Sequence, residues 1–175
     1  MSTLPYAAIP APPEEYNAAT VLSRLMDGLG FRYHWATDGL SDEVLEYRPE
    51  PTCRSVSETL HHIRNIVDMI EHSLTGERYE LPEPSPSEET DVRAETLAAI
   101  ERVSDGLRSS DPSEVSNWDA RFHMGGNDLD FPFWNTINGT MSDAIYHVGQ
   151  VVAHRRAAGQ PMDENVNVFL GMQAS

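Results

Sequence analysis

One segment, residues 55–76, limits the fold more than any other part of the chain. Its apolar residues recur at alternating intervals of four and three positions, which places them on one face of an α-helix. They are Val56, Leu60, Ile63, Val67, Ile70 and Leu74. Ser55 and Glu58 form a capping box at the start, and Gly76 supplies a stop. The segment therefore predicts a long helix with one face buried against other helices.

Three other segments show helical periodicity. The first covers about residues 17–39, the next begins at a second capping box in residues 85–88, and the last runs from Gly139 to Ala158. No segment shows the sustained alternation of apolar and polar residues that is typical of a sheet. We therefore predict an all-α protein: a four-helix bundle with long crossover connections, formed by a single domain over residues 1–175.

The connections between these helices carry weaker signals. A short helical turn is expected at residues 41–45, and a Pro-rich loop is expected at residues 80–86. A hairpin is expected within residues 118–133, where two apolar segments flank a turn. The apolar residues after Pro161 are expected to pack against the helices.

Charge limits the partners of this chain. It has 12 Lys+Arg against 28 Asp+Glu, a formal net charge of −16. Nucleic acids and anionic lipids attract proteins mainly through cationic side chains, so neither a nucleic acid nor a membrane is an expected partner. The sequence shows no apolar span, no secretion signal and only one cysteine, Cys53. A cytoplasmic location is therefore predicted.

Helical phase, at about 100° per residue, indicates on which face of its helix each histidine lies. In the helix that begins at Ser55, His62 borders the apolar seam, whereas His61 falls among charged residues on the solvent side. In the last helix, four polar residues share one stripe beside the apolar face. They are Asp143, His147, Gln150 and His154.

The stripe has two interpretations. It is equally typical of the solvated side of a helix and of a functional face. Two details favour function: every member is a residue that ligates metals or forms specific hydrogen bonds, and Asp143 and His147 have the i, i+4 spacing of two helical ligands to one ion. His154 is about 10 Å further along the helix axis than His147, too far to share that ion.

Together, His62, Asp143 and His147 would form a site with three protein ligands and an open coordination position. Two histidines and one carboxylate suit a divalent Zn, Ni or Fe ion. Gln150 would orient a ligand from outside the coordination shell.

Three short segments resemble the DinB/YfiT-like superfamily. The segment from Ser55 to Ile63 resembles the family pattern S-I-x-x-x-L-x-H-I, His147 to Gln150 resembles H-R-G-Q, and Gly159-Gln160-Pro161 resembles the closing G-x-P. The resemblance implies a four-helix bundle with a crossover, a homodimer, and a divalent metal held by three histidines. By position, the first and third of these histidines fall on His62 and His147, and Asp143 replaces the middle one.

Members of that family include thiol-dependent transferases and hydrolases, so the resemblance implies a metal-dependent hydrolase or thiol S-transferase that acts on a small-molecule substrate. An alternative is a non-catalytic ligand-binding or interaction protein of the same fold, in which the polar stripe lines a pocket or a dimer interface. A third hypothesis is a stable member of the family that has lost the site. Fold and family alone do not choose a reaction.

Overall fold

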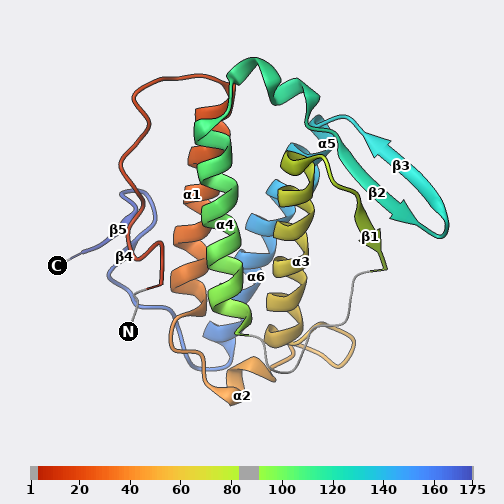
Figure 1. Ribbon diagram of the computed structural model, residues 1–175. Helices are drawn as coiled ribbons and strands as arrows, with labels where there is room; N and C mark the ends of the chain where they lie inside the picture. The colour runs from red at the N-terminus through yellow and green to blue at the C-terminus, as the bar shows by residue number, and fades with distance from the viewer. Residues whose placement is uncertain (1–3, 83–90, 175) are drawn as a thin grey trace.

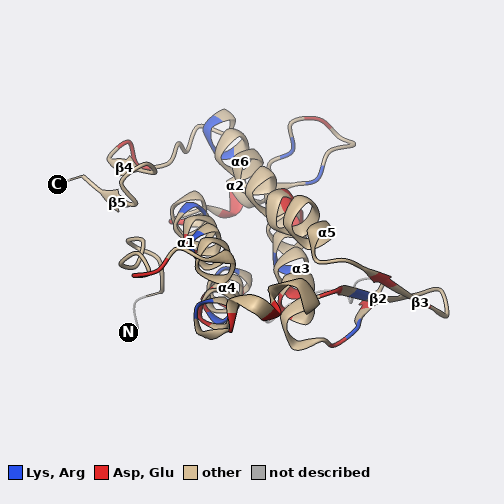
Figure 2. Cartoon of the chain, turned by 90° about the horizontal axis from the view of Figure 1, so that it is seen from above, with Lys and Arg blue, Asp and Glu red and all other residues tan. Residues whose placement is uncertain are grey.

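Four long helices dominate the protein. The computed structural model describes residues 4–82 and 91–174. The helices are α1 (Ala18–Thr37), α3 (Val56–Thr75), α4 (Val92–Ser109) and α6 (Ser142–Ala157). Both α1 and α3 contact α4 and α6, so the four helices enclose one core (Figures 1 and 2). The prediction of a mainly helical chain is confirmed at this level.

The ends of the long helices follow from local sequence. Ser55 and Glu58 form both hydrogen bonds of the predicted capping box, and α3 ends at Gly76, whose φ of 75° is readily adopted by glycine. Asn17 caps α1 in the same reciprocal way. Asp91 caps α4, whereas the capping box predicted within residues 85–88 lies outside the described residues.

The strict all-α prediction is wrong, because the chain also forms two small sheets. The three-stranded sheet contains β1 (Tyr79–Leu81), β2 (Ala120–Met124) and β3 (Asn127–Phe131). β2 and β3 form the predicted hairpin, with strands that start and end within the expected range. β1 pairs in parallel with β2 over a long sequence separation, so no local pattern could reveal it.

β1 also corrects the loop predicted at residues 80–86. Glu80 and Leu81 belong to the strand, and residues 83–86 lie outside the described part of the chain. The predicted turn at residues 41–45 is confirmed as the short helix α2 (Asp42–Leu45). A 3-10 helix, η1 (Pro112–Asn117), follows α4 and leads to the hairpin.

The last helix begins earlier than predicted and is not uniform. A short helix, α5 (Trp134–Thr136), continues through the π-helical turn η2 (Ile137–Met141) into α6. A π-helical turn widens the helix by one residue per turn and is frequent at functional sites. Here it lies directly before Asp143.

The C-terminal tail forms the second sheet, from β4 (Val166–Asn167) and β5 (Met172–Gln173). The expectation that its apolar residues pack on the helices is wrong for Phe169, which is 93% exposed. Gln160, between α6 and this tail, fixes the start of α2. Its side chain accepts a hydrogen bond from the Ser41 backbone amide and donates one to the Gly39 carbonyl oxygen.

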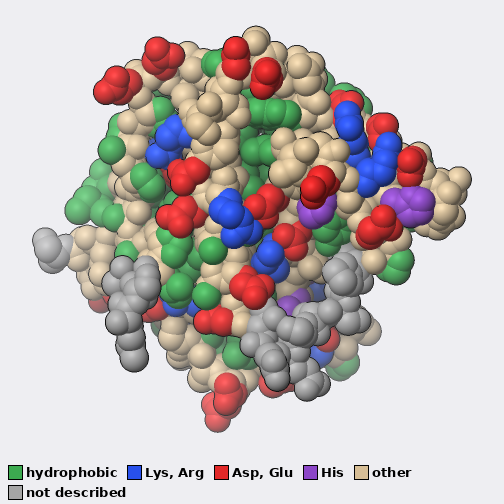
Figure 3. All heavy atoms as spheres, viewed as in Figure 1, with side chains coloured by type: hydrophobic (Ala, Val, Ile, Leu, Met, Phe, Trp, Pro, Cys, Tyr) green, Lys and Arg blue, Asp and Glu red, His purple; other side chains and the backbone are tan. Residues whose placement is uncertain are grey.

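Acidic side chains are spread over the face shown in Figure 3, with arginines among them. This distribution fits a chain in which charge keeps molecules apart rather than forming one binding surface. In the part of the chain that the structure describes, no helix combines the length and the apolar composition that crossing a membrane requires.

Candidate metal centre

The structure brings the three predicted ligands together between α3 and α6. One potential ligand atom from each of His62, Asp143 and His147 lies within 4.8 Å of the other two. His147 Nε2 is 3.4 Å from Asp143 Oδ1. The ring of His62 meets the ring of His147 edge to face, with 4.6 Å between the centroids. His62 is 81 positions from Asp143 and 85 from His147 along the chain, so only helix packing joins it to them.

Each ligand reaches this place for a local reason. Asp143 and His147 share one side of α6 because they are four residues apart. His62 precedes Ile63, which is fully buried, so its side chain lies at the edge of the packed face of α3. Since α3 and α6 run in opposite directions and contact each other, the two edges meet (Figure 1).

Gln150 forms a hydrogen bond with His147. Its Oε1 atom lies 2.7 Å from Nδ1 of His147, so Nδ1 carries the proton and donates it. That tautomer leaves the lone pair on Nε2, the atom that faces Asp143. The hydrogen bond therefore fixes both the ring orientation and the nitrogen that can bind a metal.

The site is buried on one side and open on the other. His147 is only 8% exposed, whereas the side chain of Asp143 is 47% exposed. A groove of about 600 Å³ lies beside them and is lined by His62, Ile66, Met69, Asn138, Gly139, Thr140, Ser142, Asp143 and Tyr146. The volume is in the range of small-molecule sites. A ligand can therefore approach the cluster from solvent.

Other titratable residues lie apart from this cluster. His154 packs 6.2 Å from the ring of Tyr47, and burial lowers its pKa. The pKa of His34 is also lowered by burial, and its Nδ1 donates to the Pro5 carbonyl oxygen. His123 pairs with an aspartate in the hairpin, which raises its pKa. None of these three histidines belongs to the cluster of His62, Asp143 and His147.

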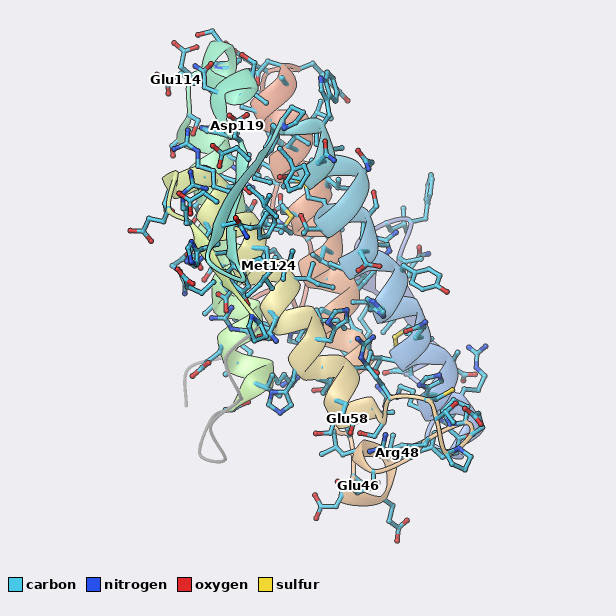
Figure 4. The ribbon with its side chains drawn as sticks, turned by 90° about the vertical axis from the view of Figure 1, so that its right-hand side faces the viewer. Glu46, Arg48, Glu58, Glu114, Asp119 and Met124 are labelled. Atoms are coloured by element: carbon cyan, nitrogen blue, oxygen red, sulfur yellow. The ribbon has the colours of Figure 1, made fainter. Side chains whose placement is uncertain are left out.

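An ion pair between Arg48 and Glu58, apart from the metal centre, stabilises the N-terminal end of α3. Arg48 donates two hydrogen bonds to the two carboxylate oxygens of Glu58, at 2.6 and 2.7 Å, and the two side chains lie side by side in Figure 4. These bonds and the Ser55 amide lower the pKa of Glu58 to about 2. Glu58 is therefore a capping residue, as the capping box predicted.

Apart from His62 and Asp143, sequence reasoning missed the residues that line the groove. Asn138 and Thr140 belong to the π-helical turn, and Tyr146, 64% exposed, lies beside the ligands on α6. No helical periodicity marks these residues as a group, because their meeting depends on the π-helical turn and on the packing of α3 against it.

Fold and site define a mainly helical protein with a three-residue cluster that can hold a metal ion. The chain matches no family model and no curated protein.

We expect that Gln150→Leu lowers metal affinity about 10- to 100-fold, because His147 would lose the partner that fixes its orientation and tautomer. The measurement is a competition titration of Zn²⁺ against a chromogenic chelator. Gln150→Glu is the matched control, since it keeps an acceptor at this position and should retain most of the affinity. Equal affinity in Gln150→Leu and the original protein would contradict the assigned role.

Proposed function

We propose that this protein binds a divalent metal ion through His62, Asp143 and His147 and acts as a metal-dependent hydrolase or thiol S-transferase on a small molecule. The observation that carries the proposal is the meeting of three potential ligand atoms within 4.8 Å at the edge of an open groove. The proposal includes membership of the DinB/YfiT-like superfamily and its four-helix bundle.

The donor set fits a divalent transition-metal ion. Two imidazoles and one carboxylate suit Zn, Ni or Fe, and three protein ligands leave at least one coordination position open. The three side chains need only small rotations to converge on one point, because their ligand atoms are already close. Gln150 supplies the outer hydrogen bond that metal-binding histidines commonly have.

The ion and the residues around it would have separate roles in activating and orienting a substrate. An ion held here would supply Lewis acidity to a water or thiol nucleophile. Gln150 holds the proton on Nδ1 of His147 and so keeps Nε2 basic. Asn138 and Thr140 place polar side chains at the groove, where they can orient an uncharged substrate.

The arrangement of the helices supports the proposed superfamily. The four long helices each contact two others. α3 and α4 run in the same direction (Figure 1), so they need a crossover connection of the kind expected of the proposed bundle. The same resemblance proposes a homodimer, which light scattering coupled to size exclusion would measure.

Metal analysis tests the proposal. Protein purified without chelator should contain about one equivalent of Zn, Ni or Fe, and Asp143→Ala and His147→Ala should each lose most of it. His61→Ala is the matched control, because His61 adjoins a ligand in sequence but lies outside the cluster. Equal metal content in all variants would contradict the proposal. If metals leave the melting temperature unchanged while an organic ligand raises it, the protein is a non-catalytic binder instead.

A further inference from the structure

A second, smaller cavity adjoins the groove of the metal centre. It has a volume of about 190 Å³ and lies between α3, the hairpin and the π-helical turn η2. The two spaces share three lining residues, Met69, Gly139 and Thr140. The same residues line both spaces, so the smaller cavity lies directly beside the groove of the metal centre.

Aromatic side chains from the hairpin form one wall of this smaller cavity. The rings of Phe122 and Phe131 lie 6.1 Å apart between centroids, and Ala120 is almost fully buried next to them. These residues share one face of the hairpin, since Ala120 pairs with Phe131 and successive residues of a strand alternate in direction. The hairpin thus presents an apolar face to α3.

The hydroxyl groups in the cavity are already satisfied. Ser73 donates to the Met69 carbonyl oxygen at 3.1 Å and lies 3.2 Å from the hydroxyl of Thr136. Since the Ser73 proton is used, Thr136 donates its proton to Ser73. Thr140 donates to the Thr136 carbonyl oxygen. These hydroxyls therefore need no hydrogen-bonding partner from a ligand and behave as part of an apolar lining, whereas Asn135, which also lines the cavity, is exposed to solvent.

The groove and the smaller cavity meet at Gly139, which lines both of them. A Cβ atom built there would meet no heavy atom within 4 Å, so this residue has open space beside it. Among the described residues no arginine lines either space, and the chain contains no lysine. An anionic group would therefore find no counter-ion in the smaller cavity, in a protein of net charge −16.

We propose that the smaller cavity holds an uncharged ring, or an alkyl group of similar size, that belongs to the substrate whose reacting group lies at His62, Asp143 and His147. This inference rests on the proposed function. The size fits, because a closed apolar cavity of about 150 Å³ is enough for benzene. Specificity for a neutral, ring-bearing small molecule is therefore set by the hairpin and the π-helical turn, not by the metal ligands.

Two metal-binding probes that differ only in their side group test this inference. With Co²⁺-loaded protein, 5-phenylpentanohydroxamic acid should bind at least about tenfold more tightly than pentanohydroxamic acid, because only the former carries a ring on a chain long enough to reach the cavity, where Met69 lies seven residues, about 10 Å, along α3 from His62. The measurement is the change in the Co²⁺ absorption spectrum. Equal affinity for the two probes would overturn the proposal.

Gly139→Leu should fill the space where the groove meets the smaller cavity and remove the preference for the probe that carries a ring. It should not change the affinity for acetohydroxamic acid, which is too short to reach that space. Leucine favours helical structure more than glycine does, so the variant should fold, which circular dichroism would verify. Gly149→Leu is the matched control: it makes the same change in α6, beside a different cavity, and should keep the preference. An unchanged preference in Gly139→Leu would overturn the proposal.

A third measurement works without metal and separates this inference from the proposed function. Benzyl alcohol should bind metal-free protein in the millimolar range or tighter, with saturation-transfer NMR as the readout, and Gly139→Leu should abolish that signal. If the protein binds no Co²⁺ but benzyl alcohol still binds and is blocked at Gly139, the cavity is confirmed and the metal proposal fails. Equal binding of benzyl alcohol to both proteins would overturn the cavity proposal.

Discussion

Replacing Asp27 with alanine is expected to lower the free energy of unfolding by about 3 kcal/mol or more. Asp27 lies in α1, is 0% exposed, and accepts hydrogen bonds from Ser104 at 2.6 Å and Arg108 at 2.8 Å in α4. The hydroxyl of Tyr6 lies 3.5 Å from the same carboxylate. The substitution would leave these donors without their acceptor, and a buried unsatisfied donor destabilises the folded state.

Urea denaturation followed by circular dichroism would measure this loss. Asp105→Ala is the matched control, because Asp105 is exposed in α4 and should change stability by less than about 0.5 kcal/mol. Asp27→Asn keeps an acceptor for Ser104 but turns an amide toward Arg108, so it should be intermediate. A loss below about 1 kcal/mol for Asp27→Ala would show that the network contributes little to the fold.

Replacing Arg155 with methionine is expected to cost about 3 kcal/mol of stability, because this buried cation closes the C-terminal end of α1. Its side chain donates to the carbonyl oxygens of Trp35, Ala36, Asp38 and Gln160, over distances of 2.8 to 3.1 Å. The last carbonyl groups of a helix have no partner within that helix. Arg155 is only 4% exposed, and burial lowers its pKa.

Arg155→Lys should not restore the lost stability, because one ammonium group cannot reach four oxygens that are arranged around a planar guanidinium. Arg156→Met is the control, since the neighbouring arginine is exposed and the same substitution there should be nearly neutral. Thermal and urea unfolding of the three variants would measure the differences. If Arg155→Met and Arg156→Met were equally stable, the closure of α1 by Arg155 would be contradicted.

The hydrogen bonds of Asp27 and Arg155 show why sequence reasoning could not find some of the residues that stabilise the fold. No sequence pattern distinguishes Arg155 and Asp27 from the solvated charged residues that are usual in an amphipathic helix. Apart from Tyr6 and Gln160, their hydrogen-bonding partners lie 77 to 120 positions away along the chain. No local pattern marks such a pair, and only the packing of α1 against α4 and α6 reveals it.

The hairpin, β1 and the tail show where sequence reasoning succeeds and where it fails. The hairpin was recognised because its turn and flanking residues are local signals, whereas β1 was taken for part of a loop because its partner strand is distant. Phe169 was expected to pack against the helices because it is apolar, yet it is 93% exposed. Burial depends on whether another element covers the residue, which hydrophobicity alone does not decide.

By itself, the sequence determined the long helices, their caps and the phase of their polar residues, because these depend on contacts within about four positions. It thereby placed His62, Asp143, His147 and Gln150 on the correct sides of α3 and α6. Only the tertiary structure decided that these sides face one another, that a π-helical turn opens the groove, and that the hairpin closes a second cavity beside it. Those features depend on which helices pack together, and that is settled by burial and hydrogen bonding across the whole chain.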